Sequence, residues 1–338
     1  VTGMDLRGRR YPLWTQEQGN GKPERPAAWP LQNIPEAAYA PMGVWHSSAG
    51  YAALLTHDAW SEIDLARAHA DRVVLRSHAA MPGAVFVRGA TPRERMRSVT
   101  GYVGRVPEPP AWVFGLWQDV FGGVERVDAV VRALRDNGIP ASAIWGEDWL
   151  GEVSTPTGPR LSYEWRWSPA RYPDLPARIE ALQADGFAFL GYVNPFVPEA
   201  AFNFADGVAG GHLVREPDGA PLVRLDPRFQ PAGMLDVTSS AARAWFATYV
   251  ATAVQDVGVS GWMADYAEWA PLAALYGSGE SPWHVHNRYP ILWQQANRDA
   301  LAAANRDSPR GSNDFAFFTR SGWASVNGGS AGVAQVLC

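Results

Sequence analysis

The sequence has little of what marks disulfide-bonded, membrane-spanning or nucleic-acid-binding proteins. Its 338 residues include one cysteine, Cys338, which rules out a disulfide within the chain and fits a reducing, cytoplasmic compartment. No apolar run reaches the ~20 residues of a membrane helix, and the first residues lack the charged and then apolar pattern of a secretory leader. The formal net charge of −5 argues against nucleic acid or an anionic membrane as a partner.

Aromatic residues, by contrast, are abundant. The chain has 16 Trp residues, and 47% of its residues are hydrophobic, which is enough for a large buried core. Most of the indoles are expected to be core residues. Because flat aromatic faces also stack on the apolar faces of sugars, this composition in an acidic protein favours a carbohydrate enzyme over most other classes.

Two patterns of secondary structure divide the chain near residue 105. Residues 1–105 contain short strand-like runs broken by Pro and Gly, which predicts an antiparallel β-sandwich. In residues 106–338, apolar runs of strand length alternate with helical patterns, which is typical of βα units around a parallel sheet. About five such units are present, and the last of their helices is expected at 290–305. Their strands are expected at 112–118, 143–149, 188–196, 261–264 and 315–320.

The stretch Gly261–Trp269 places two carboxyl groups among aromatic side chains. Asp265 comes directly after an apolar strand, and Glu268 follows three residues later. Buried carboxylates cost free energy unless they are paired or put to use. One interpretation is a catalytic carboxylate at the carboxyl end of a parallel strand, with Trp262 in an aromatic wall that stacks on a sugar. The other is a capping Asp at a strand-to-helix turn, and these residues alone leave both open.

A second expected strand end repeats this arrangement, because Glu147 and Asp148 also lie between tryptophans. A metal site, by contrast, is not predicted. His284 and His286 have the spacing of a ligand pair, but no third cluster of ligands accompanies them. We therefore expect neither a metal nor another cofactor.

The run Gly-Trp-Met-Ala-Asp-Tyr-Ala-Glu at 261–268 resembles the nucleophile signature of glycoside hydrolase family 31, a family of retaining α-glycosidases. The similarity extends from Val1 to roughly Arg320 and is closest to the branch that contains the sulfoquinovosidases. It implies a galactose-mutarotase-like β-sandwich followed by an incomplete (β/α)8 barrel, since a closed barrel has eight strands. It also implies an α-glycoside as the substrate.

The resemblance gives roles to individual residues. Asp265 is implied as the nucleophile that attacks the anomeric carbon, with Arg320 beside it. Glu268 orients the site by hydrogen bonds, and Glu147 binds the far hydroxyls of the sugar. We further expect supporting roles for Asp148, which braces the site, for Gln118, which adds a hydrogen bond from the first strand, and for the loop 13–21, which reaches the rim of the site.

A second catalytic carboxyl group is missing from its expected place. Retaining glycosidases need two such groups ~5–5.5 Å apart, and in this family the acid/base is an Asp in a Trp-Ala-Gly-Asp segment after the fifth strand. Here Ser325–Cys338 contains no Asp, Glu or His, and neither Asp314 nor Glu268 matches the family position. A truncated or frameshifted reading frame would explain this absence, and we expect little or no glycosidase activity from the chain.

The identity of the sugar depends on a few residues. The sulfoquinovosidase branch binds the sulfonate with an Arg followed three residues later by a Trp. This chain keeps the Arg as Arg160 but has Tyr163 at the Trp position, and Glu147 would repel an anion unless a cation offsets it. We therefore expect a neutral α-glucoside-type sugar, with a sulfoquinovoside as the alternative. A non-catalytic sugar-binding protein and a transglycosylase remain open.

Overall fold

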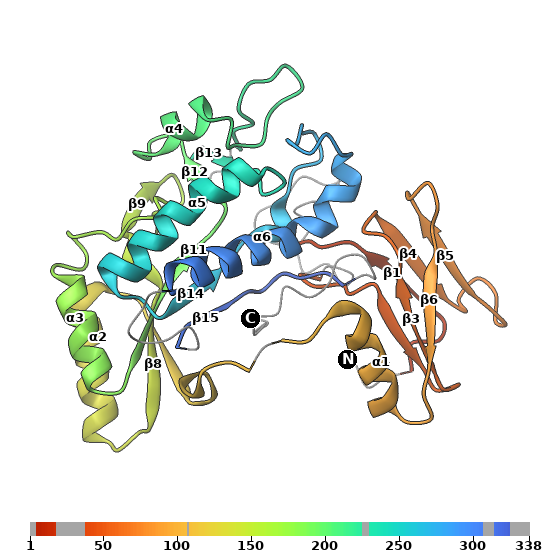
Figure 1. Ribbon diagram of the computed structural model, residues 1–338, viewed down its shortest axis with the longest axis horizontal. Coiled ribbons are helices and arrows are strands. Elements are labelled where there is room, and N and C mark those ends of the chain that lie inside the picture. Colours follow the sequence, from red (N-terminus) through yellow and green to blue (C-terminus); the bar gives the residue numbers. More distant parts are fainter. Residues whose placement is uncertain (1–4, 18–37, 107, 225–229, 307–313, 325–338) are drawn as a thin grey trace.

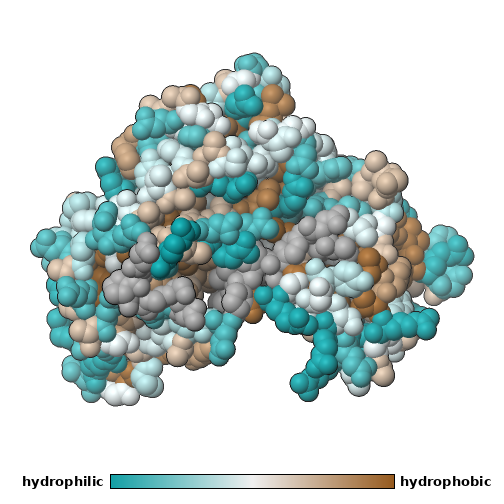
Figure 2. Space-filling model, in the orientation of Figure 1, coloured by the Kyte–Doolittle hydropathy of each residue, from teal (hydrophilic) through white to brown (hydrophobic). Residues whose placement is uncertain are grey.

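The structure is a computed structural model that describes residues 5–17, 38–106, 108–224, 230–306 and 314–324. Antiparallel strands come first in the chain, and a parallel sheet with helices follows (Figure 1). The surface view in the same orientation shows two lobes separated by a notch along the lower edge (Figure 2). None of the helices in the described ranges is long and apolar enough to cross a membrane.

Two three-stranded antiparallel sheets form the N-terminal part, as the strand-like runs predict. One sheet has the order β1-β4-β5 and the other the order β2-β3-β6. The strands are β1 (Arg9–Leu13), β2 (Val44–Ser47), β3 (Tyr51–Leu55), β4 (Ser61–Leu65), β5 (Val73–Ser77) and β6 (Ala84–Arg88). Helix α1 (Pro92–Val103) follows, and Thr91 and Glu94 close its first turn as a capping box.

A five-stranded sheet with the order β15-β14-β11-β8-β7 forms the second part. Each strand pairs in parallel with its neighbours, so the carboxyl ends of all five lie at one edge. The strands are β7 (Leu116–Val120), β8 (Ala141–Gly146), β11 (Ala188–Val193), β14 (Gly261–Ala264) and β15 (Ala316–Phe318). This is part of an α/β barrel, and the described strands do not close into a ring. The division near residue 105 stays a prediction.

Helices α2, α3 and α6 pack against strands of the parallel sheet. Helices α5 and α6 lie side by side next to β14 (Figure 1), where Phe246 packs against Trp293. The helices are α2 (Gly123–Asp136), α3 (Leu175–Ala184), α4 (Phe204–Ala209), α5 (Ser240–Thr252) and α6 (Pro282–Ala304). Short elements connect them, namely η1 (Ala111–Phe114), η2 (Glu147–Leu150), β9 (Glu152–Thr155), β10 (Gly158–Leu161), β12 (Phe196–Pro198), β13 (Ala232–Met234), η3 (Ala253–Val257) and η4 (Ala267–Trp269).

Two expected elements differ from the structure. The first strand of the sheet is not 112–118, because η1 occupies the first part of that range and β7 begins only at Leu116. Helix α6 begins at Pro282 and not at Pro290. A proline at the start of a helix loses no hydrogen bond, since the first N–H groups have no partner within the helix. Pro290 lies in the helix interior and is buried there.

Gly261 explains why β14 can pair closely with β15. It lies opposite Ala316 in the register, and a Cβ atom at residue 261 would lie 1.6 Å from the Ala316 carbonyl oxygen. Only glycine fits this position. The close backbone pairing therefore fixes where β14 starts, and with that start it fixes where the strand ends.

Candidate active site

Asp265 lies directly after β14, at the carboxyl edge of the parallel sheet, and is 5% exposed. Its N–H donates to the Val193 carbonyl oxygen at 2.9 Å, which extends the pairing of β11 and β14 by one residue. The Tyr192 hydroxyl, also from β11, donates to Oδ2 of Asp265 at 2.6 Å. Two neighbouring strands therefore fix the backbone and one carboxyl oxygen of Asp265.

Arg320, which follows β15, brings three carboxyl groups together. Its Nε lies 2.9 Å from Oδ1 of Asp265. Its Nη2 lies 2.6 Å from Oε1 of Glu268 and 2.8 Å from Oε2 of Glu17. We call Glu17, Asp265, Glu268 and Arg320 the carboxylate cluster. The structure thus brings together three residues that were expected to meet, Asp265, Glu268 and Arg320, and adds a fourth.

The charges of the carboxylate cluster do not balance, because one guanidinium faces three carboxyl groups. Burial raises the pKa of Glu268, Arg320 opposes this effect, and Asp265 and Glu17 add to it. Burial alone would lower the pKa of Arg320, but the three acids raise it, so Arg320 stays charged. Glu268 is fully buried, and it is the member of the cluster best placed to hold a proton.

Glu17 comes from the N-terminal part of the chain, and contacts with α6 fix the segment that carries it. The Thr15 N–H donates to Oδ1 of Asn287 at 2.9 Å, and the Thr15 carbonyl oxygen lies 2.7 Å from Nε2 of His286. The Trp269 indole then donates to Oε2 of Glu17 at 2.8 Å. Glu17 is therefore buried in the cluster and does not stand at a rim. Residues 18–21 of the expected loop lie outside the described residues.

Aromatic rings surround the carboxylate cluster. Tyr163 lies 6.2 Å from Tyr192 and 6.2 Å from Phe196, in stacked arrangements. The ring of Tyr266 lies 4.4 Å from the Arg320 guanidinium carbon. Tyr266 has a φ of 57°, which is uncommon for a residue with a side chain. This conformation turns the chain so that Asp265 and Glu268, on either side of it, both reach Arg320.

Glu147 begins η2, one residue after the end of β8, and so lies at the same sheet edge as Asp265. Burial and the nearby charges of Asp119, Asp265 and Asp148 raise the pKa of Glu147 to about 7. Within the described ranges, every charged group that shifts this pKa is an acid. Gln118, near the end of β7, donates its side-chain amide to the Asp119 carbonyl oxygen at 2.9 Å.

Asp148 has a different environment from its neighbour Glu147. Its Oδ2 accepts the N–H groups of Gly122 and Gly123, at 2.9 and 3.0 Å, where α2 begins. The same oxygen accepts from Nε of Arg171 at 2.7 Å, and Oδ1 accepts from the Tyr172 hydroxyl at 2.5 Å. These four donors join η2 to α2 and to the segment before α3, and the bracing role of Asp148 in the site stays a prediction.

Two expected site residues lie away from the carboxylate cluster. Trp262 is buried between the sheet and α6, where its indole donates to Oδ1 of Asn297 at 2.8 Å. Side chains alternate along a strand, so Trp262 faces the helices, and its expected place in the sugar-binding wall is wrong. Arg160 lies on β10, where it donates to the Pro159 carbonyl oxygen at 2.9 Å and to the Thr157 hydroxyl at 3.3 Å.

Asp314 does not replace the missing acid/base. Asp314 precedes β15, and because the strands are parallel, it lies at the edge of the sheet opposite to Asp265. Ser325–Cys338 lies outside the described residues. The described ranges also contain no group of three or more His, Cys, Asp or Glu residues that could hold a metal. His286 is instead held between the carbonyl oxygens of Ala270 and Thr15.

Sequence reasoning missed Tyr192 and the contacts of Glu17. Tyr192 could have been found, since it lies near the end of the strand that pairs with β14, opposite Met263. Its neighbours in space follow once the order of the strands is known. Glu17 gives no such signal, because it is 303 residues from Arg320 in the sequence and lies in an irregular segment.

Comparisons with known proteins agree with this geometry. Residues 106–331 match the family described as Glycosyl hydrolases family 31 TIM-barrel domain. The chain is 28% identical over 327 residues to a sulfoquinovosidase of Escherichia coli strain K12, covering 94% of this chain and 47% of the relative. It is 29% identical to a sulfoquinovosidase of Agrobacterium fabrum, covering 96% and 49%.

A solved structure shows the same fold. The family 31 sulfoquinovosidase from E. rectale, in complex with an aza-sugar inhibitor, superposes with a TM-score of 0.84 and 29% identity. The match covers 96% of this chain and 49% of that structure. The chain thus spans about half the length of the relatives that it matches.

Proposed function

Because the chain belongs to glycoside hydrolase family 31, we propose that its site performs the retaining cleavage of an α-glycoside, with Asp265 as the nucleophile. In this reaction an oxygen of Asp265 bonds to the anomeric carbon, the bond to the leaving oxygen breaks, and a glycosyl ester forms. Water then cleaves the ester and releases the sugar. The observation that carries the proposal is the buried strand-end position of Asp265, with Arg320 on one oxygen and Tyr192 on the other.

Each neighbour of Asp265 has a role in this proposal. The hydrogen bond from Tyr192 and the ion pair with Arg320 hold the carboxyl plane, so that an oxygen can be aimed at the anomeric carbon. Glu268 and Glu17 in turn hold the guanidinium of Arg320. Glu147, at the same edge of the sheet, binds hydroxyl groups of the sugar, a task that suits a carboxyl group in a partly dry site.

The leaving oxygen needs a proton, and residues 315–324, the described part of the segment where the family carries its acid/base, contain no carboxyl group to give it. Losing general acid catalysis costs about 10²- to 10⁴-fold in rate, and less when the leaving group is a good one. We therefore propose that the chain as printed has little glycosidase activity. Without turnover, the chain would act as a sugar-binding protein through the same site. This is the second function that the geometry allows. If an alcohol replaced water, the same ester would give transglycosylation.

For the sugar, we propose a neutral α-glucoside-type glycone, because Glu147 lies near three further acids and no cation in the described part of the chain shifts its pKa. A sulfoquinovoside is the alternative, supported by the relatives named above and by the presence of Arg160. In the structure Arg160 contacts its own hairpin, which favours the neutral sugar. We retain a cytoplasmic location as a prediction.

Two measurements test the proposal. Hydrolysis of methyl α-glucoside, whose leaving group needs a proton, should be barely detectable, and appreciable turnover that Asp265→Ala abolishes would refute the proposed low activity. Calorimetric titration of Asp265→Ala with methyl α-glucoside and with methyl α-sulfoquinovoside should show tighter binding of the neutral sugar. Tighter binding of the sulfonated sugar would select the alternative.

A further inference from the structure

The chain that follows Arg320 leaves the parallel sheet and runs along the antiparallel strands (Figure 1). We call residues 321–324 the exit segment, and all four of them are buried. The Gly322 N–H donates to the Tyr39 carbonyl oxygen at 3.2 Å, and the Gly43 N–H donates to the Ala324 carbonyl oxygen at 3.1 Å. The N-terminal part of the chain therefore binds the backbone of the exit segment at two points.

Trp323 holds the exit segment by its side chain. It is 2% exposed, and its indole N–H donates at 2.9 Å to Oδ1 of Asp58, which lies between β3 and β4. A buried indole with an apolar surrounding and a hydrogen-bond partner has one well-defined position. The ring packs where both antiparallel sheets and α6 meet, in a cluster with Leu13, Leu55, Ile63 and Ile291.

Helix α6 holds the residues on either side of Arg320. Strand β15 ends at Phe318, so Arg320 lies beyond the paired part of the strand. The side-chain amide of Gln294 donates to the Ser321 carbonyl oxygen at 2.8 Å and to the Thr319 hydroxyl at 3.3 Å. These bonds and the exit segment together fix the backbone from which the Arg320 side chain reaches into the carboxylate cluster.

The position of the exit segment bears on Asp265 because Arg320 lies between them. Nε of Arg320 lies 2.9 Å from Oδ1 of Asp265. Tyr39, which accepts the N–H of Gly322, has its ring 4.8 Å from the guanidinium carbon of Arg320 and donates its hydroxyl to Oε1 of Glu17 at 3.3 Å. A shift of the exit segment would therefore move the groups that hold Arg320. Reaction rates are sensitive to displacements of about 1 Å at such positions.

We propose that Trp323, through its hydrogen bond to Asp58, is a positioning residue for the attack by Asp265. It fixes the exit segment, the exit segment fixes Arg320, and Arg320 holds one carboxyl oxygen of Asp265 while the other is aimed at the anomeric carbon. The inference rests on the proposed function, because it concerns the rate at which Asp265 reacts. It adds that this rate depends on a hydrogen bond made in the N-terminal part of the chain.

The test measures the rate of labelling by 5-fluoro-α-glucosyl fluoride, followed by mass spectrometry of the intact protein. An oxygen of Asp265 bonds to the anomeric carbon and fluoride leaves with the bonding electron pair, so no proton donor is needed. Varying the reagent concentration separates the rate constant from the half-saturating concentration. Trp323→Phe keeps a ring but has no N–H, and it should lower the rate constant about tenfold. The half-saturating concentration should stay within about twofold.

Two changes at Asp58 separate positioning from simple loss of packing. Asp58→Ala removes the acceptor and should lower the rate constant about as much as Trp323→Phe does. Asp58→Asn keeps an acceptor oxygen for the indole and should keep most of the rate. Because neither change removes the Trp323 ring from the core, a difference between them reports on the hydrogen bond.

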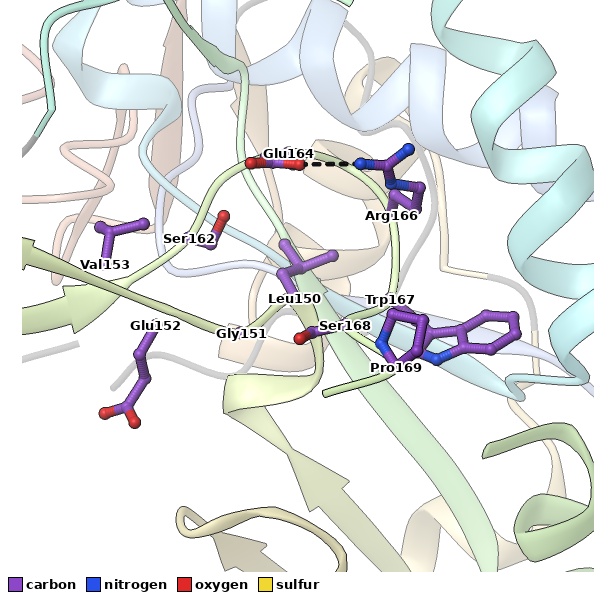
Figure 3. A pocket seen from close by; sticks show the side chains of 10 residues that line it. All are labelled: Leu150, Gly151, Glu152, Val153, Ser162, Glu164, Arg166, Trp167, Ser168 and Pro169. Atoms are coloured by element: carbon purple, nitrogen blue, oxygen red, sulfur yellow. Dashed lines mark hydrogen bonds and ion pairs between the residues drawn. The ribbon is translucent and has the colours of Figure 1, made fainter. Parts of the chain in front are cut away.

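Two further indoles give matched controls. The Trp112 indole donates at 3.4 Å to the Asp314 carbonyl oxygen, at the other end of β15. Trp167 lies beside a cleft near Glu164 and Arg166 (Figure 3), and its Nε1 has no hydrogen-bond partner among the described residues. Trp112→Phe thus removes a hydrogen bond far from Arg320, and Trp167→Phe removes an indole without a bond. Both should label at the rate of the unaltered chain.

The outcomes are distinct. A rate constant for Trp323→Phe equal to that of the controls, or an Asp58→Asn as slow as Asp58→Ala, would overturn the positioning role. If circular dichroism shows that Trp323→Phe is misfolded, the two Asp58 variants carry the test. Binding of a glucose-type aza-sugar, measured by calorimetry, shows that the site is formed. An unaltered chain that binds the aza-sugar but is not labelled would overturn the proposed function, and this inference with it.

Discussion

The Arg320 guanidinium lies 2.8 Å from Oε2 of Glu17, a residue 303 positions earlier in the chain. This ion pair connects the N-terminal sheets to the same arginine that contacts Asp265. Both side chains are nearly buried, with 12% and 11% of their surfaces exposed, so water screens the interaction weakly. The N-terminal part of the chain therefore belongs to the candidate site.

The first prediction concerns Arg320 itself. Arg320→Met would leave three buried carboxyl groups without a cation, and losing one partner of a buried ion pair typically costs about 3–5 kcal/mol. We expect a loss of this size in the free energy of unfolding, measured with urea at pH 7.5. Glu17→Gln should cost less, about 1–2 kcal/mol, because Arg320 keeps its two other acids.

The control for this prediction is Arg72→Met. Arg72 pairs with Asp71 at 3.0 Å, but 61% and 72% of their side-chain surfaces are exposed. Exposed pairs contribute little, so the change should be within about 0.5 kcal/mol. A loss in Arg320→Met no larger than in this control would mean that the carboxylate cluster does not stabilise the fold.

The second prediction concerns the pH dependence that Glu147 causes. Its pKa is about 7 in the folded protein, above the ~4.3 of an unfolded chain. The folded state therefore binds the proton more tightly between these values, and its stability falls as the pH rises through this window. Glu147→Gln should stabilise the protein by about 1–3 kcal/mol at pH 8 and change it little at pH 4.5.

Thermal unfolding from pH 4.5 to 8 checks this prediction, with the exposed Glu125→Gln as the matched control.

The carboxyl group of Glu147 should also govern the binding of sulfonated sugars. Below pH 7 it is neutral, so their affinity should rise as the pH falls, while the affinity for neutral sugars stays nearly flat. A stability gain for Glu147→Gln that is equal at both ends of the pH range would contradict the assignment.

The third prediction concerns Asp148, the neighbour of Glu147. Asp148→Asn should lower the free energy of unfolding by about 2–4 kcal/mol, since an amide group faces four donors with only one acceptor oxygen. Glu147→Gln and Asp148→Asn, at adjacent residues, should thus change the free energy of unfolding in opposite directions at pH 8. Urea unfolding measures both variants, and a neutral result for Asp148→Asn would mean that its bonds to Gly122 and Arg171 are not important for stability.

The sequence predicts those parts of the site that depend on local patterns. The apolar run before Asp265 predicts a strand end, and the alternation of strands and helices predicts a parallel sheet in which such ends meet. The predicted position of Trp262 is wrong because the side chain of an aromatic residue in a buried strand can point to either face of the sheet. Its face follows from the register with β15, which local sequence does not define.

Contacts between distant segments are the least predictable part. Glu17 reaches Arg320 only because Thr15 bonds to Asn287 and His286 on α6, and these three segments are unrelated in sequence. The predicted start of α6 at Pro290 is also wrong, because Pro282 and Pro290 both suit a first turn. Val285, His286, Asn287 and Tyr289, between the two prolines, are buried in α6, and burial is a property of the whole fold.

The central claim is that Asp265 is the nucleophile, and covalent labelling tests it most directly. A 5-fluoro-α-glucosyl fluoride has a leaving group that departs without a proton donor, so the missing acid/base does not prevent the first step. Mass spectrometry of the intact protein and its peptides should show one glycosyl group on Asp265, and none in Asp265→Ala. An unmodified Asp265 in protein that binds the aza-sugar, or equal labelling of Asp265→Ala, would contradict the account.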